Sequence, residues 1–239
     1  MTPPDRPVDG IVDGPDGLGL NPPSNPIPVP SASVNLEVEV KFLVADRVAV
    51  RQRLLSLGAE IKTARVYERN VRFDTTGENL LANSYLLRLR QDDRVRLTFK
   101  GPAAEDAASE AKIREELEIT IDDFDLMAKI LERLGFHPVQ VYEKYRETFH
   151  WQGVEIVLDE TPFGDFVELE GTEDGIRSAA AGLGLDWSRR VLANYLALME
   201  LARQTFNLPF TDLTFANFAQ HPVSLAELLP VCVLYEGES

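Results

Sequence analysis

The sequence predicts an α+β protein built round a closed barrel of eight antiparallel β-strands, with helices packed on the outside. Eight segments have the length and alternation of strands, and several are separated by only a short turn. Seven of them carry acidic or basic side chains at every second position, so one face is ionic and the other aliphatic. An open sheet with one wet face would fit this pattern too. Closure is the better solution, because it pairs every strand edge and leaves a lumen for side chains or a small ligand.

The first predicted elements are a strand and a helix. Residues 34–44 (VNLEVEVKFLV) alternate between aliphatic and charged side chains, as a strand with two different faces does. Residues 45–61 follow with apolar residues at helical spacing, and Gly58 is the expected stop. The apolar side of this helix is predicted to consist of Val48, Leu54, Leu55 and Leu57.

Strands dominate the middle of the chain. They are predicted at 66–75, 84–91, 95–101, 111–120, 139–151, 154–160 and 164–171. Asp92 and Asp93 are expected to form a tight hairpin turn, and the small residues of 102–110 a mobile loop. A second helix is predicted at 122–136, between an aspartate-rich start and Gly135. The helical patterns that follow strand 164–171 cover 172–183 and 188–204.

The chain divides into one domain and two flanking segments. Residues 1–33 hold nine of the fifteen prolines without any periodicity, so they are predicted to be a disordered leader. Residues 34–205 form the domain, which is long enough to bury one good core. Residues 206–239 are an aromatic and irregular C-terminal extension, to which the sequence assigns no role.

Composition and charge exclude several classes of function. A net charge of -15 argues against general nucleic-acid binding and against an anionic membrane surface, since both need a basic patch. The single cysteine, Cys232, excludes an internal disulfide and a cysteine-rich zinc site. No apolar run has membrane-spanning length and no signal peptide is visible, so a cytoplasmic location is predicted. The sequence leaves both a monomer and a homodimer open.

The charged rows are the main functional signal. For any one pair, the ordinary interpretation is the solvated face of an amphipathic strand. The whole set favours a site, because the basic residues cluster in adjoining strands and closure brings the carboxylates of the first, fifth, seventh and eighth strands together. Arginine and lysine suit phosphate oxygens, and carboxylates suit Mg²⁺ or Mn²⁺. The rows are Glu37, Glu39, Lys41; Arg88, Arg90; Arg96, Thr98, Lys100; Lys112, Arg114, Glu116, Glu118; Lys144, Arg146; Asp159; and Glu168, Glu170.

These motifs, in this order, resemble the CYTH superfamily, also called the triphosphate tunnel metalloenzymes. The similarity runs from the opening Glu-x-Glu-x-Lys of Glu37 to the Phe-Val-Glu-Leu-Glu that ends at Glu170, and it covers roughly residues 34–200. It implies a closed eight-stranded tunnel that binds a linear triphosphate and requires Mg²⁺ or Mn²⁺. Family members include inorganic, thiamine and RNA triphosphatases and class IV adenylyl cyclases.

The resemblance also implies a role for each charged residue. The phosphate-binding residues would be Lys41, Arg88, Arg90, Lys100, Arg114, Lys144 and Arg146. The metal ligands would be Glu37, Glu39, Asp159, Glu168 and Glu170. Glu116 and Glu118 would support that cluster or a second ion, and together with Glu37, Glu39 and Lys41 they form the expected catalytic group.

Hydrolysis of the triphosphate is favoured over cyclisation, because water is the simpler acceptor and no set of residues marks a nucleobase pocket. The runner-up is a class IV adenylyl cyclase, which would use the same cations and ions to make cyclic AMP and pyrophosphate from ATP. A non-catalytic polyphosphate-binding module could keep the basic rows, but it would not need the full set of carboxylates. In an unrelated barrel with solvated charges, the motifs would not converge in the lumen.

Overall fold

The computed structural model describes residues 35–102 and 111–233. The predicted leader, all but Pro102 of the small-residue loop, and the last six residues of the C-terminal extension lie outside this range. The strands are β1 (Asn35–Val44), β2 (Glu60–Asp74), β3 (Leu86–Gln91), β4 (Val95–Pro102), β5 (Lys112–Ile121), β6 (His137–Trp151), β7 (Val154–Thr161) and β8 (Gly164–Glu170). The α-helices are α1 (Arg47–Ser56), α2 (Asn79–Ala82), α3 (Phe124–Arg133), α4 (Glu173–Leu183), α5 (Tyr195–Phe206) and α6 (Phe215–Gln220).

The eight strands form a closed antiparallel barrel, as the sequence predicted. Their order round the barrel is β1-β5-β4-β3-β2-β6-β7-β8, so β1 closes the ring between β5 and β8. The register pairs Glu39 with Lys112 of β5 on one side and with Glu170 of β8 on the other. Because side chains alternate between faces, the predicted ionic rows of these strands all turn toward the lumen.

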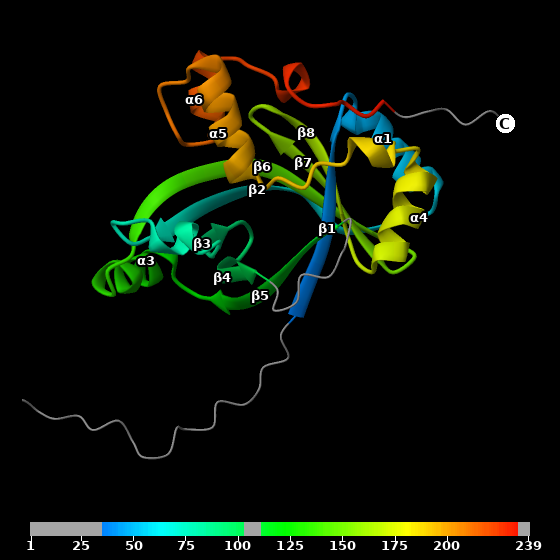
Figure 1. Cartoon of the computed structure of the whole chain (residues 1–239). Coiled ribbons are helices and arrows are strands. Elements are labelled where there is room, and N and C mark those ends of the chain that lie inside the picture. Colours follow the sequence, from blue (N-terminus) through cyan, green and yellow to red (C-terminus); the bar gives the residue numbers. More distant parts are fainter. Residues whose placement is uncertain (1–34, 103–110, 234–239) are drawn as a thin grey trace, which may run out of the picture. The chain divides into compact units, whose positions relative to one another are not determined.

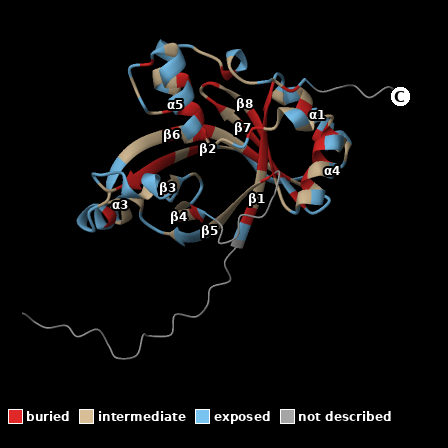
Figure 2. Cartoon of the chain, viewed as in Figure 1, coloured by how far each residue is buried: buried red, intermediate tan, exposed pale blue. Residues whose placement is uncertain are grey.

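Helices cover the aliphatic outer face of the barrel in separate groups (Figure 1). Helices α1 and α4 pack over β1, β7 and β8, where Val40, Phe42 and Ile176 belong to one buried cluster. Helix α3 packs over β2 and β3 through Leu131. The burial pattern follows this arrangement, with buried residues along β1, β7 and β8 and on the side of α4 that faces them (Figure 2).

Two helices differ from their prediction. In α1 the buried residues are Val50 and Leu54, one turn apart, whereas Val48 and Leu55 are 55% and 43% exposed. Only a narrow stripe of α1 meets α4 and the barrel, so the wider apolar side predicted from spacing was wrong. The helix predicted at 188–204 is interrupted, because a short 3-10 helix ends at Arg189 and α5 begins at Tyr195. Between them the backbone N–H of Val191 donates to the carbonyl of Lys41 at 2.7 Å.

The start of β2 and the helix α2 were also not predicted. Strand β2 begins at Glu60, six residues before its predicted start, and its first part pairs with β6 through shifts in register. Residues 60–65 are exposed and lack the aliphatic alternation by which a strand is found in a sequence. Helix α2 has only four residues, which is too short for a periodic signal.

The C-terminal residues pack against one end of the barrel. Leu213 exchanges backbone hydrogen bonds with β6, and Cys232 does so with β1. Leu208, Leu213, Phe218 and Leu225 join the buried cluster formed by α5, Leu43 and Phe166. Leu43 and Phe166 have the same strand parity as Lys41 and Glu168, so the lumen changes from ionic to apolar at this end. No helix within the described residues is both long and apolar enough for a membrane crossing.

Candidate active site

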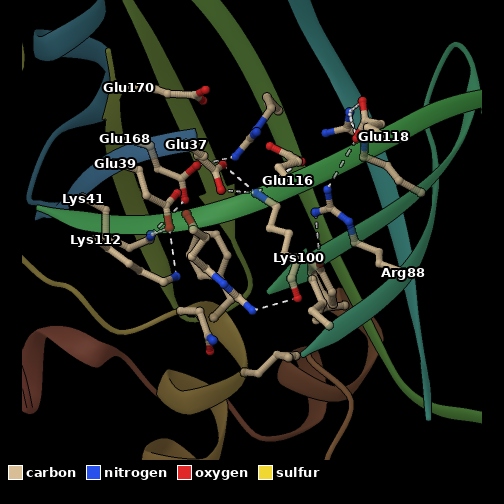
Figure 3. A pocket seen from close by; sticks show the side chains of 18 of the residues that line it. Glu37, Glu39, Lys41, Arg88, Lys100, Lys112, Glu116, Glu118, Glu168 and Glu170 are labelled. Carbon is tan, nitrogen blue, oxygen red and sulfur yellow. Dashed lines mark hydrogen bonds and ion pairs between the residues drawn. The ribbon is translucent and has the colours of Figure 1, made fainter. Parts of the chain in front are cut away.

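The barrel encloses a cavity of about 670 Å³ whose wall carries charges of both signs (Figure 3). Among the described residues, eight cationic side chains line it: Lys41, Arg88, Arg90, Lys100, Lys112, Arg114, Lys144 and Arg146. Seven carboxylates from the same part of the chain line it with them: Glu37, Glu39, Glu116, Glu118, Glu155, Glu168 and Glu170. All the predicted site residues except Asp159 are therefore on this wall. Adjacent rows from different strands bring them together, as closure of the sheet requires.

One group of charges lies where β1 meets β5 and β8. Lys112 Nζ donates to Glu39 Oε1 at 2.9 Å, and Lys41 Nζ lies 3.5 Å from both Glu39 Oε1 and Glu168 Oε1. Burial raises the pKa of Glu39, but Lys41 and Lys112 outweigh it and lower that pKa to about 2. Glu39 is therefore ionised throughout the physiological pH range, and Lys41, which is 2% exposed, remains charged beside it.

A second group links β1, β4 and β5. Lys100 Nζ lies 2.5 Å from both carboxylate oxygens of Glu37 and 3.4 Å from Glu116. Burial raises the pKa of the Glu37 carboxyl, the facing charges of Glu39 and Glu116 raise it further, and Lys100 lowers it. Lys100 thus lies between two neighbouring carboxylates.

A third group lies on β3 and β4. Arg90 Nη2 donates to Glu118 at 3.1 Å, and Thr98 Oγ1 donates to the same carboxylate at 2.8 Å. Arg88 Nη1 donates to the hydroxyl of Tyr142 at 3.0 Å. The Nε atoms of Arg88 and Arg90 are buried and make no hydrogen bond within the described residues. Both guanidinium groups nevertheless line the cavity, where a bound anion could accept from their terminal nitrogens.

The fourth group lies behind the wall, on β6 and β7. Asp159 is fully buried and does not line the cavity. Its carboxylate accepts hydrogen bonds from Lys144 Nζ at 2.8 Å, from Arg146 at 2.6 and 2.7 Å, and from the hydroxyl of Tyr195 at 2.9 Å. Arg146 also donates to Glu168 at 2.6 Å. Asp159 thus connects two cavity-lining cations to the first turn of α5.

Sequence reasoning missed four residues of this site. Glu155 points to the same side of β7 as Asp159, so the alternation of side chains along that strand could have identified it. Lys112 was part of a predicted row but received no role. Glu68 is buried in β2 and lies 3.7 Å from Lys144 and from Arg90. Its row was overlooked because Asn70 interrupts the alternation of charge. Tyr195 comes from the helical region, where no strand pattern could place it on the barrel wall.

A smaller cavity of about 280 Å³ adjoins the first. Arg90, Arg146 and Glu155 line both cavities, so these three side chains stand between them. The rest of its wall comes mainly from the start of β2 and from the hairpin between β3 and β4, including Lys62, Arg94 and Arg96. The ionic lining therefore continues past the main cavity.

Two carboxylates on the wall make no direct ion pair within the described residues. Glu155 and Glu170 are opposite each other in the pairing of β7 with β8, and neither makes an ion pair or hydrogen bond there. Burial raises the pKa of Glu170 to about 7, and the facing carboxylates of Glu37 and Glu155 contribute to the rise. A cation bound beside Glu170 would offset this accumulation of negative charge.

The raised pKa of Glu170 predicts a pH-dependent cost in stability. Glu170 ionises near pH 4.5 in the unfolded chain but near pH 7 in the folded protein, so the metal-free protein loses stability as the pH rises through that window. Glu170→Gln is expected to be more stable than the parent by about 2 kcal/mol at pH 8 and about equal to it below pH 4.5. Urea unfolding curves of the variant and the parent, recorded in EDTA at both pH values, measure this difference in the free energy of unfolding.

The matched control for this prediction is Glu115→Gln. Glu115 lies on β5 between Arg114 and Glu116, so its side chain turns to the other face of the strand. Its effect on the free energy of unfolding should be the same at both pH values. An equal effect of Glu170→Gln at both pH values would contradict the raised pKa.

The donor set fits a hard divalent cation that shares its ligands with a substrate. No group of three or more His, Cys, Asp or Glu side chains in residues 35–102 and 111–233 is arranged to hold a metal ion by itself. Mg²⁺ commonly binds through one or two carboxylates together with substrate phosphates, and not in a cage made only of protein ligands. Carboxylates on a wall that also carries phosphate-binding cations fit that mode of binding.

Comparison with known proteins places these features in a family. The model of the CYTH domain matches residues 35–182. A candidate adenylate cyclase of Methanocaldococcus jannaschii is 30% identical over 137 residues, which are 56% of this chain and 76% of that protein.

Two solved structures share the fold. A candidate adenylate cyclase of Vibrio parahaemolyticus is 21% identical, with a TM-score of 0.63 over 70% of this chain and 99% of that one. A Hippeastrum protein, described as a candidate adenylyl cyclase with a dominant triphosphatase activity, is 20% identical. Its TM-score is 0.52, over 70% of this chain and 96% of that one.

Proposed function

The chain belongs to the CYTH domain family, and from that premise we propose that it hydrolyses a triphosphate bound inside its barrel with Mg²⁺ or Mn²⁺ as cofactor. The observation that carries the proposal is the convergence of eight cationic side chains and seven carboxylates on one cavity. A linear triphosphate with a divalent cation has the complementary pair of charges. Ion pairs such as that of Lys100 with Glu37 can exchange partners with it, the lysine for phosphate and the carboxylate for metal.

The cations of the wall would bind the phosphates. Lys41, Arg88, Arg90, Lys100, Arg114, Lys144 and Arg146 have this role in the proposal, and Lys112 lies among them. Arginine offers paired donors to phosphate oxygens, whereas lysine offers a compact charge. Arg88 and Arg90 both line the cavity from β3, which supports a place for an anion beside that strand.

The carboxylates of β1 and β8 would hold the metal ion, namely Glu37, Glu39, Glu168 and Glu170. Asp159 was expected to be a further ligand, but its oxygens accept four hydrogen bonds from cations and from Tyr195. We assign it instead to holding Lys144 and Arg146 in place. A bound divalent ion would polarise a phosphoryl oxygen and neutralise part of its charge.

Phosphoryl transfer needs positioning and charge neutralisation more than covalent chemistry. In the proposed reaction, water attacks the terminal phosphorus and the bond to the bridging oxygen breaks, so orthophosphate and a diphosphate leave. The cations stabilise the charge that gathers on the equatorial and leaving oxygens. Glu116 and Glu118, on the β5 side of the cavity, are the candidates to orient the water and accept its proton.

A class IV adenylyl cyclase is the second candidate, and two observations favour it. The relative from M. jannaschii carries the name of an adenylate cyclase. Leu36, Leu86 and Leu196 also line the cavity, and leucine side chains could contact a nucleobase. The unpaired carboxylates Glu155 and Glu170 speak against the third alternative, a non-catalytic polyphosphate-binding module, which would not need a metal.

Removal of metal tests the proposal. Purified protein with Mg²⁺ or Mn²⁺ is expected to release phosphate from inorganic triphosphate, and EDTA should lower the rate at least about 100-fold, because an ion at the phosphate contributes several kcal/mol to transition-state stabilisation. ATP and thiamine triphosphate, run in parallel, show whether an organic group is accepted. Full activity in EDTA would refute metal dependence, and binding without turnover of any of the three would favour the binding module.

A further inference from the structure

Tyr195 is where the helical layer of the protein touches the ionic lining of the barrel. It is the first residue of α5, whose N-terminus is capped by the Asn194 side chain accepting from Ala197 N at 2.8 Å. Just before it, Val191 N donates to the carbonyl of Lys41 on β1 at 2.7 Å. Both attachments fix the entry of α5, so the Tyr195 side chain is held on the cavity wall, which it lines.

The ring of Tyr195 lies beside two buried ammonium groups. Lys144 Nζ is 5.1 Å and Lys41 Nζ is 5.6 Å from the ring centroid. Both distances fall within the range of cation–π attraction, which is stronger where the cation is removed from water. These two lysines are only 3% and 2% exposed. Phe166 packs edge-on against the ring at 5.3 Å and supports it from the apolar side.

The hydroxyl of Tyr195 contacts one of these lysines, Lys144, indirectly through Asp159. It donates to Asp159 Oδ2 at 2.9 Å, the oxygen that also accepts from Lys144 and Arg146. Burial and the nearby Asp159 and Glu168 carboxylates raise the pKa of Tyr195 well above its usual range, so the hydroxyl stays protonated and remains a donor. Asp159 is thereby held beneath these cations, Lys144 and Arg146, and does not line the cavity.

We propose that Tyr195 is a positioning residue, which holds Lys41 and Lys144 with its ring and Asp159 with its hydroxyl so that the lysines present their ammonium groups to a bound triphosphate. The inference rests on the proposed function for its ligand. A residue that only filled the apolar cluster at this end of the barrel would need neither the hydroxyl nor the two cation contacts. The two roles therefore predict different results for substitutions that remove ring and hydroxyl separately.

Calorimetric titration with inorganic triphosphate in EDTA separates these roles without turnover. Tyr195→Phe keeps the ring and is expected to weaken the affinity about fivefold, whereas Tyr195→Leu removes both contacts and should weaken it about 30-fold or more. Phe149→Leu is the control, because Phe149 is also buried but lies in the cluster under α1 and α4. Phe149→Leu should lower the melting temperature about as much as Tyr195→Leu does, but it should leave the affinity for triphosphate within about twofold of the parent.

The outcomes separate this inference from the proposed function. Tyr195→Leu with parental affinity, or with no more loss than Phe149→Leu, would overturn the positioning role. Steady-state kinetics should agree, with the rise in KM for Tyr195→Phe larger than its fall in kcat. If the parent binds triphosphate but does not hydrolyse it, the hydrolase proposal fails while the affinity series still decides the role of Tyr195. A parent that does not bind triphosphate in EDTA would overturn the positioning role, whereas the hydrolase proposal would still be decided by turnover in Mg²⁺.

Discussion

Glu39→Gln is expected to lower kcat/KM for inorganic triphosphate by at least about 100-fold, because the affinity of hard cations depends on ligand charge and one full charge is lost. Glu39 is the best placed of the proposed ligands. It lies at the centre of β1, between Lys112 of β5 and Glu170 of β8, and its pKa of about 2 keeps it ionised. Glutamine has the same size and can still accept the hydrogen bond from Lys112, so the fold should persist.

The measurement is the rate as a function of Mg²⁺ concentration, with a melting curve for each protein. The variant should need far more Mg²⁺ for half-maximal rate, and its melting temperature should stay within a few degrees of the parent. Glu115→Gln, on the outer face of β5, is the control and should be unchanged in both. An unaltered metal dependence at full activity would remove Glu39 from the site.

Loss of a phosphate-binding cation should have the next largest effect. Lys100→Ala and Arg90→Ala are each expected to lower kcat/KM by a factor equivalent to roughly 2–4 kcal/mol in the barrier, the range of a charge-assisted contact to developing charge. In Lys100→Ala the Glu37 carboxylate also loses its partner, so the pKa of Glu37, already raised by burial, should rise further. Its activity should therefore fall more steeply at low pH than that of the parent.

Kinetics with inorganic triphosphate from pH 6 to pH 9 measure both effects. Lys129→Ala, on the exposed side of α3, serves as the control for loss of a lysine and should match the parent. Circular dichroism should show that Lys100→Ala and Arg90→Ala remain folded. If both variants had the kinetics of the parent, phosphate binding would have to lie in another part of the cavity.

The barrel and most of its lining were predictable because strand parity is a local property. Once Glu37 and Glu39 point inward, Lys41 must do so as well, and the same holds along β3, β4, β5, β6 and β8. Closure of the sheet then brings the ionic faces of these strands together in one lumen. Asp159 shows the limit of this argument. Parity assigned it correctly to the inner face, but not to the layer behind Lys144 and Arg146.

The features that the sequence did not predict depend on tertiary contacts. The start of α5 is set by the hydrogen bond between Val191 and Lys41, residues far apart in the chain. Tyr195 reaches the cavity only because of that contact. The stripe by which α1 packs depends on how α4 lies beside it, so Val48 and Leu55 are exposed although their spacing fits an apolar face. The C-terminal residues have no periodicity of their own and gain structure by packing on β6 and on β1.

The identity of the products tests the central claim most directly. Phosphorus NMR of the full chain with Mg²⁺ should show pyrophosphate and orthophosphate from inorganic triphosphate. From ATP it should show mainly ADP and orthophosphate, because none of the side chains assigned here would fix the ribose hydroxyl next to the α-phosphorus, and cyclisation depends on that proximity. Cyclic AMP and pyrophosphate as the main products from ATP, formed faster than inorganic triphosphate is hydrolysed, would contradict the hydrolase and establish the cyclase.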